Sequence, residues 1–144
     1  MNSKNKKLKI AIAGLGFGKK VHLEALKESN YLTPVAVYHH DKKQKSILEK
    51  ETGLEFFHDW EDLVKSPEID GIIIATPPES RFKLAKQALE NNKNLLLEKP
   101  VSISSYEIEE LQRISLINNL SVCVDFEYRA VPLFLQTKKL IDEN

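Results

Sequence analysis

Three glycines follow a short apolar run near the start of the chain, in the segment Gly14-Leu15-Gly16-Phe17-Gly18. Gly14 would let the chain turn sharply. The bare backbone at Gly16 would let a diphosphate approach the N–H groups at the start of a helix, where peptide dipoles favour anions. The dinucleotide-binding pattern expects its third glycine where Lys19 stands, and Gly18 beside it would supply the missing room. The segment therefore predicts a dinucleotide diphosphate site, with residues 14 to 18 as contacts.

The residues alone leave two alternatives open for this turn. Any tight junction between a strand and a helix can require glycine, so the turn could be purely structural. A methyltransferase also carries a glycine turn after its first strand, but usually with an acidic residue two positions before the first glycine. Ile12 stands at that position here. The place of the turn, directly after the first predicted strand, favours dinucleotide binding over both.

A second polar segment follows the second predicted strand and reads Tyr38-His39-His40-Asp41-Lys42-Lys43. In dinucleotide-binding domains a carboxylate here binds the adenosine ribose, whereas a cation accommodates a 2′-phosphate. His39 stands nearest the expected acid, and Asp41 is better placed to cap the next helix. His39 and His40 are therefore candidate cofactor contacts, with exposed loop histidines as the alternative. The cofactor is predicted to be NAD or NADP with a slight lean to NADP, and two histidines without further ligands predict no metal site.

The elements that must position these residues alternate between short apolar runs and longer amphipathic stretches. Strands are predicted at residues 8–13, 34–38, 55–57, 69–75, 94–97 and 120–126. Helices are predicted at residues 18–29, 42–52, 59–66, 79–92, 104–117 and from Pro132 onward. Uninterrupted β-branched runs such as residues 72–74 are typical of strands covered on both faces. The pattern predicts an α/β doubly wound parallel sheet, a Rossmann fold of about six strands with helices on both faces.

Composition excludes several classes of protein. The 144 residues suit one domain, and 21 basic against 21 acidic residues leave no net charge to attract nucleic acid or an anionic membrane. Neither a membrane span of about 20 apolar residues nor a secretory signal is recognisable, so a cytoplasmic location is expected. The single cysteine, Cys123, excludes an internal disulfide, and its apolar neighbours predict a buried thiol.

Three features together resemble the Gfo/Idh/MocA family of oxidoreductases, over about residues 8 to 132. They are the glycine turn with His22 in the helix behind it, the segment Ala75-Thr76-Pro77-Pro78 after the fourth strand, and the triplet Glu98-Lys99-Pro100 after the fifth. The triplet is the most specific of the three. Because all of them follow parallel strands, they would meet at the edge of the sheet where such folds bind ligands.

The resemblance implies roles for individual residues. Ala75, Thr76 and Pro77 would pass beside the ribose and nicotinamide of the cofactor. Glu98 and Lys99 would lie at the nicotinamide end. Lys99 is the candidate catalytic residue, either with a pKa lowered by burial or as a cation that stabilises an alkoxide. Pro100 would fix this turn, through a cis bond in some members.

Three positions depart from the family pattern. Arg81 stands where members often carry histidine, and a guanidinium cannot shuttle protons, so it would bind an acidic substrate group or face the solvent. Asp125 and Glu127 replace a Gly-Phe-Asn-like sequence before Arg129 and bring carboxylates near the cleft, with no assigned role.

The expected domain organisation is a basic tail at residues 1–7, a dinucleotide-binding domain at 8–130, and a helix at 131–144 leading to a C-terminal domain that this chain lacks. In the family, that domain carries substrate-binding residues and tends to form the oligomer interface, so a homo-oligomer is expected only through it. The resemblance implies an NAD(P)-dependent dehydrogenase that acts on a sugar, cyclitol or related polyol, with this chain alone incomplete for catalysis. A stand-alone, non-catalytic NAD(P)-binding or sensing module is the alternative.

Overall fold

In the computed structural model, which describes residues 6–143, six parallel strands form one sheet. The strands are β1 (Leu8–Ala13), β2 (Leu32–Tyr38), β3 (Glu55–Phe57), β4 (Gly71–Ile74), β5 (Asn94–Leu97) and β6 (Val122–Val124). Their order across the sheet is β3-β2-β1-β4-β5-β6, and every neighbouring pair is parallel. The strand order reverses between β1 and β4, as in doubly wound dinucleotide-binding folds. The predicted fold class is confirmed.

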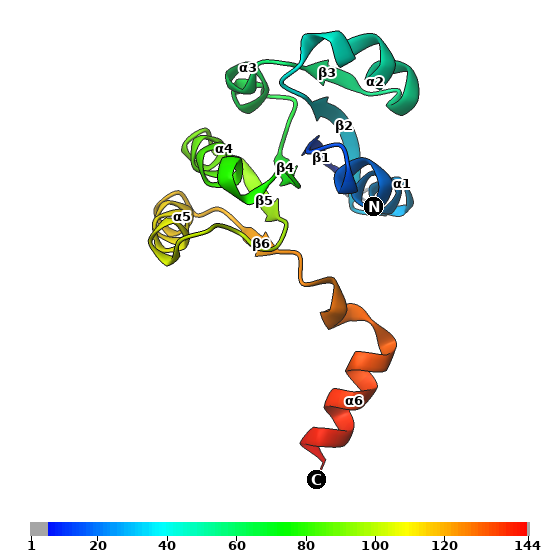
Figure 1. Cartoon of the computed structure of the whole chain (residues 1–144), viewed down its shortest axis with the longest axis vertical. Helices are drawn as coiled ribbons and strands as arrows, with labels where there is room; N and C mark the ends of the chain where they lie inside the picture. The colour runs from blue at the N-terminus through cyan, green and yellow to red at the C-terminus, as the bar shows by residue number, and fades with distance from the viewer. Residues whose placement is uncertain (1–5, 144) are drawn as a thin grey trace, which may run out of the picture.

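Helices connect the strands and cover both faces of the sheet (Figure 1). They are α1 (Leu23–Glu28), α2 (Lys45–Thr52), α3 (Trp60–Lys65), α4 (Pro78–Glu90), α5 (Ser105–Ile117) and α6 (Pro132–Asp142). A π-helical turn, Gly18–His22, runs straight into α1, and short 3₁₀ turns precede α2 and α6. Helices α3, α4 and α5 lie on one face, and α1 and α2 lie on the other.

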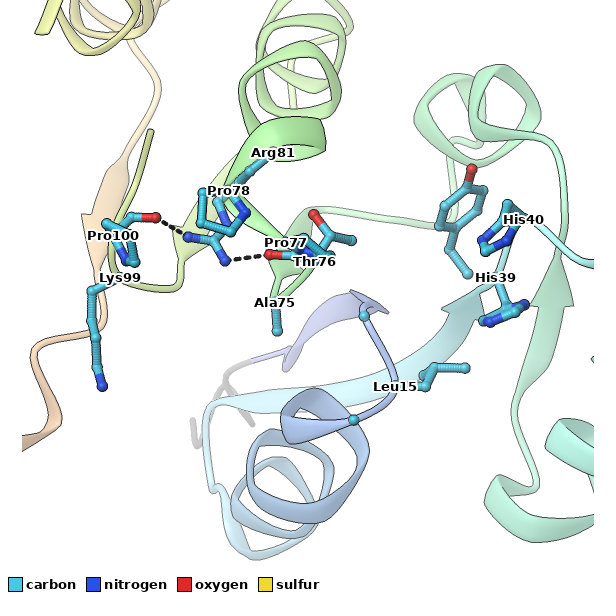
Figure 2. A pocket seen from close by; sticks show the side chains of 13 residues that line it. Leu15, His39, His40, Ala75, Thr76, Pro77, Pro78, Arg81, Lys99 and Pro100 are labelled. Atoms are coloured by element: carbon cyan, nitrogen blue, oxygen red, sulfur yellow. Dashed lines mark hydrogen bonds between the residues drawn. The ribbon is translucent and has the colours of Figure 1, made fainter. Parts of the chain in front are cut away.

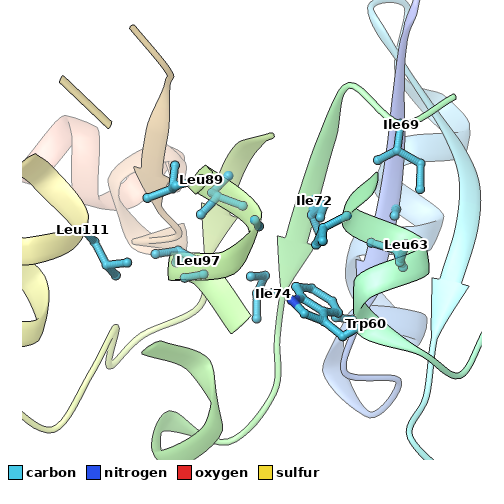
Figure 3. Close-up of a cluster of buried hydrophobic side chains, with 14 of the residues drawn as sticks. Trp60, Leu63, Ile69, Ile72, Ile74, Leu89, Leu97 and Leu111 are labelled. Carbon is cyan, nitrogen blue, oxygen red and sulfur yellow. The ribbon is translucent and has the colours of Figure 1, made fainter. Parts of the chain in front are cut away.

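The core consists of apolar side chains that the central strands send to both faces. Ile72 and Ile74 pack beneath α3, α4 and α5 (Figure 3), whereas Ile73 and Ile12 pack beneath α1. Each such side chain contributes about 1.5–3 kcal/mol when it is fully buried. Burial on both faces accounts for the apolar sequence of β4, which does not alternate with polar residues.

Helices α3 and α5 begin with different side-chain contacts. Asp59 caps α3, because its carboxylate accepts a hydrogen bond of 2.8 Å from the N–H of Glu61. Ser104 precedes α5 but makes no side-chain capping bond. The carboxylate of Glu107 instead accepts from the hydroxyl of Ser102, which itself accepts from the N–H of Ser104. The side-chain hydrogen bonds at the start of α5 therefore involve the hydroxyl of Ser102, two residues before Ser104.

The prediction that Cys123 is buried is wrong, since the residue is exposed. Cys123 lies in β6 at the edge of the sheet. Helices α1 and α2 cover this face of the sheet over other strands but leave it open at Cys123. A shallow apolar surface there includes Ile73, Leu96 and Cys123. An apolar run in an edge strand therefore does not guarantee burial of both of its faces.

The ends of the chain differ from this layered body. Helix α6 projects away from the sheet and buries none of its residues (Figure 1). Most of the predicted basic tail, residues 1–5, lies outside the described residues. Within residues 6–143, none of the helices has the length and apolar character needed to cross a membrane.

Candidate functional site

A cavity of about 480 Å³ lies at the carboxyl ends of β1, β2, β4 and β5 (Figure 2). Four turns contribute to it, one after each of these strands. Its lining consists of Gly14, Leu15, Gly16, Tyr38, His39, His40, Ala75, Thr76, Pro77, Pro78, Arg81, Lys99 and Pro100. The topology dictates this meeting, because the carboxyl ends of parallel strands share one edge of the sheet.

Each of the three glycines in the first turn has different surroundings at the position where a Cβ would lie. Gly14 has a φ of +93°, and a Cβ there would lie 2.3 Å from the carbonyl carbon of Ala75. A Cβ on Gly18 would lie 2.9 Å from Cγ2 of Ile12, so this glycine allows the helix to pack closely against β1. A Cβ on Gly16 would meet nothing within 4 Å. Only Gly16 faces open space, as a position reserved for an external group would.

The start of the following helix is not closed by a side chain of the protein. Phe17 occupies its N-cap position and makes no capping hydrogen bond. Residues 18–28 are continuously helical, so the dipole of the whole segment ends here. This part of the cavity can therefore stabilise an anion with backbone N–H groups.

At the far end of the cavity, the rings of His39 and His40 stack with centroids 4.6 Å apart. Asp41 caps the next helical turn as predicted, accepting from the N–H of Lys43 at 2.9 Å. No acidic side chain occurs among the described residues that line the cavity. Tyr38 joins this wall to the core, since its ring packs edge-on against Trp60 at 4.9 Å.

The turn after β4 brings a polar atom without a partner into the cavity wall. The hydroxyl of Thr76 is buried and has no hydrogen-bond partner among the described residues. Such a hydroxyl has a free energy cost unless a ligand or water satisfies it. The open approach to Gly16 and this hydroxyl both suit a bound dinucleotide, with its diphosphate at one and a ribose hydroxyl or carboxamide at the other.

Lys99 lies on the turn after β5, whose Lys99–Pro100 peptide bond is cis, as the resemblance implied. Its ammonium nitrogen lies 3.0 Å from a carboxylate oxygen of Glu127, and its side chain is 47% exposed. The hydrogen bond and charge of Glu127 raise the pKa of Lys99. The expectation of a pKa lowered by burial is wrong, and Lys99 is an ammonium ion held by a neighbouring carboxylate.

Glu98 turns away from the cavity into a buried polar cluster. Its Oε1 lies 2.8 Å from Nε2 of His22, and the other oxygen accepts from the N–H of Lys99 at 3.2 Å. Asp125 completes the cluster, 3.8 Å from the same histidine nitrogen. Desolvation raises the pKa of Asp125, His22 lowers it, and the charges of Glu98 and Glu127 raise it further. The three groups lie as close together as metal ligands do, and the absence of a metal stays a prediction.

The expectation that Arg81 faces the solvent is wrong, whereas binding of an acidic substrate group stays a prediction. Arg81 is only 3% exposed and donates hydrogen bonds to the carbonyl oxygens of Thr76 and Pro100 (Figure 2). It also donates to the carbonyl oxygen of Glu98. The sequence pattern offered no signal for these contacts, since helix position alone does not tell which carbonyls a long side chain reaches.

The cavity unites most of the predicted cofactor contacts. Those in its lining are Gly14, Leu15, Gly16, His39, His40, Ala75, Thr76, Pro77 and Lys99. Phe17, Gly18 and Glu98 lie beside it but are not part of its wall, and their part in binding stays a prediction. Tyr38, Pro78, Arg81 and Pro100 line it without having been singled out as cofactor contacts.

The strand order and the glycine turn define a Rossmann-type domain of the dinucleotide-binding class. Residues 8–126 match the sequence profile of the Gfo/Idh/MocA family, described as "Oxidoreductase family, NAD-binding Rossmann fold". The chain belongs to this family.

Individual relatives agree with this assignment. An uncharacterised oxidoreductase of Synechocystis sp., sll0816, is 32% identical over 98% of this chain and 38% of its own length. An inositol 2-dehydrogenase of Rubrobacter xylanophilus is 28% identical over 73% of the chain and 30% of its own length. A solved scyllo-inositol dehydrogenase of Lactobacillus casei, with bound NAD(H) and scyllo-inositol, superposes with a TM-score of 0.86 at 27% identity. That match covers 96% of this chain and 42% of the other, so the chain spans less than half of each relative.

Proposed function

We propose that this chain is the cofactor-binding part of an NAD(P)-dependent oxidoreductase that acts on a sugar, cyclitol or related polyol. The observation that carries the proposal is that Gly16 and Lys99 line the same cavity. A dinucleotide held by its diphosphate at Gly16 would extend along this cavity toward Lys99. The inositol dehydrogenases among the relatives support the substrate class.

Each part of the cavity would contact a different part of the cofactor or substrate. The backbone at residues 14–18 would bind the diphosphate, and the turn at residues 75–77 would contact the ribose and nicotinamide, with the free hydroxyl of Thr76 as a hydrogen-bonding group. The nicotinamide supplies the hydride chemistry when the cofactor is bound. Lys99, kept protonated by Glu127, would stabilise negative charge on the reacting oxygen of the substrate.

The histidine end of the cavity supports a slight preference for NADP over NAD. A ribose with two free hydroxyls is commonly bound by a carboxylate, whereas a 2′-phosphate needs donors or cations. His39 and His40 supply ring nitrogens there, and the acid of this segment, Asp41, is engaged with the N–H of Lys43.

Titration of the chain with NADH and NADPH tests the binding part of this proposal. The single tryptophan, Trp60, packs on the cavity residue Tyr38, so quenching of its emission should report binding. Gly16→Ala places a methyl group in open space. It should therefore leave the melting temperature nearly unchanged while it weakens cofactor affinity about tenfold or more, by holding the diphosphate away from the N–H groups.

Gly53→Ala is the matched control, because Gly53 also has open space at its Cβ position but a φ of +69°. This substitution should cost about 1 kcal/mol of stability and leave cofactor affinity unchanged. Absence of binding by the unsubstituted chain, or equal affinity of the Gly16→Ala variant, would contradict the proposed diphosphate site.

A further inference from the structure

Arg81 is the one guanidinium in the described part of the chain that is buried, and it makes hydrogen bonds only to main-chain carbonyl oxygens. One terminal nitrogen donates to the carbonyls of Glu98 and Pro100, and the other donates to that of Thr76. Desolvation lowers the pKa of Arg81, while the charges of Glu98 and Glu79 raise it. Arginine stays protonated even so, and the three carbonyls receive charge-assisted hydrogen bonds.

These three carbonyls belong to two different turns of the cavity wall. Thr76 lies on the turn after β4. Glu98 and Pro100 lie on the turn after β5, one on each side of Lys99. The backbone hydrogen bonds between β4 and β5 end with the one from the N–H of Glu98 to the carbonyl of Ile74, and beyond this point the guanidinium bridges the two turns (Figure 2).

The shape of the guanidinium makes arginine the residue suited to this contact. Its two terminal nitrogens are fixed in one plane and point along separate directions, so they can bridge carbonyls that face each other across a gap. A lysine ammonium has a single nitrogen and would reach one turn at a time.

We propose that Arg81 is a positioning residue, which sets the spacing of the Thr76 and Lys99 turns and thereby the part of the cavity that receives the nicotinamide. The inference rests on the proposed function and names a residue that acts through the backbone rather than by touching the cofactor. It assigns Arg81 to the nicotinamide half of the site only. The diphosphate and adenosine half, formed at Gly16, His39 and His40, does not depend on it.

A comparison of ligands with and without nicotinamide tests this assignment. The dissociation constants of ADP-ribose and NADH, or of their 2′-phosphorylated forms if NADPH is preferred, are measured on the unsubstituted chain and on Arg81→Met. The variant should bind the ADP-ribose ligand within about twofold of the unsubstituted chain. It should lose about tenfold of the additional affinity that nicotinamide provides, as expected for the loss of charge-assisted hydrogen bonds.

Arg113→Met is the matched control, because Arg113 lies on the exposed face of α5 and pairs only with Glu110 among its ion-pair partners. It should change neither constant. Arg81→Lys keeps the charge and serves if Arg81→Met does not fold, and it should show the same selective loss.

The outcomes separate the two proposals. The positioning role would be overturned if Arg81→Met lost the same factor of affinity for both ligands, or if it kept the full additional affinity that nicotinamide provides. Failure of both Arg81 variants to fold would overturn it as well. An unsubstituted chain that binds neither ligand would overturn the proposed function, and this inference with it.

Discussion

Nε2 of His22 lies 2.8 Å from Oε1 of Glu98, and this buried contact joins the helix behind the glycine turn to the turn that carries Lys99. The contact thereby connects the glycine turn to the Lys99 turn, and both turns line the cavity. Glu98 extends the connection, since its second oxygen accepts from the N–H of Lys99. The position of Lys99 relative to Gly16 thus depends on a polar contact in the interior.

Removal of one partner of this contact should be costly. His22→Leu leaves the carboxylate of Glu98 buried without its histidine partner, and we expect a loss of about 2–4 kcal/mol in the free energy of unfolding. Glu98→Gln keeps an oxygen that can accept a hydrogen bond, so its cost should be nearer to about 1 kcal/mol. Urea denaturation measures both. Equal, small effects would show that the contact does not stabilise the domain.

Asp125 should make stability fall as the pH rises. Desolvation first, and then the neighbouring carboxylates, raise its pKa in the folded state, although His22 opposes this. The folded protein then holds the Asp125 proton to a higher pH than the unfolded chain does. Its stabilising contribution is therefore present at low pH and is lost as the pH rises through the folded pKa.

Asp125→Asn should accordingly be more stable than the unsubstituted chain at about pH 8, by up to about 1 kcal/mol, with the difference shrinking toward about pH 4. Urea denaturation across this range measures it. Asp142→Asn, on the exposed helix α6, is the control and should show no such trend. A stability difference that instead grows in favour of the unsubstituted chain as the pH rises would contradict the raised pKa.

Glu127 should control the protonation of Lys99. Because the hydrogen bond and charge of Glu127 raise the pKa of Lys99, Glu127→Gln should shift the pH dependence of Lys99 labelling by an amine-reactive reagent to lower pH. Mass spectrometry of the peptide that contains Lys99 reports the extent of labelling. Glu110→Gln removes a carboxylate that pairs with Lys86 elsewhere and should leave the Lys99 curve unchanged. Coincident curves for Glu127→Gln and the unsubstituted chain would refute the pairing in solution.

The two histidines should contribute to any preference for NADPH. Replacement of both His39 and His40 by glutamine should reduce the ratio of NADPH to NADH affinity by up to about tenfold, the scale of a charge-assisted hydrogen bond. His58→Gln is the control, because His58 is exposed and does not line the cavity. An unchanged ratio in the double variant would remove these side chains from 2′-phosphate recognition.

The fold was predictable from local patterns because each strand is a short apolar run bounded by polar or glycine-containing turns. Residues 72–74 indicated burial on both faces, and the order of elements then limited the sheet to a doubly wound arrangement. The same reasoning failed at Cys123. Its neighbours are as apolar as those of a central strand, and only the position of β6 at the edge determines that one side stays open.

The cavity was predictable where turns follow strands, but the side chains behind it were not. Lys99 and Gly16 line the same cavity because both follow parallel strands. The contacts that Arg81 makes with Glu98 and that Lys99 makes with Glu127 depend on rotamers and on residues distant in the sequence. No periodicity or motif encodes such contacts, so Arg81 could not be assigned and the direction of the Lys99 pKa shift was reversed.

Backbone amide resonances of the isotope-labelled chain, followed as ligand is added, test most directly whether Gly16 and Lys99 share one dinucleotide site. ADP-ribose should shift the amides of residues 14–18 and of His39 and His40. NADH or NADPH should shift these and also the amides of Thr76 and Lys99. Shifts confined to other surfaces, or amides at Lys99 that respond no differently to the nicotinamide-containing ligand, would contradict a single site spanning the two turns.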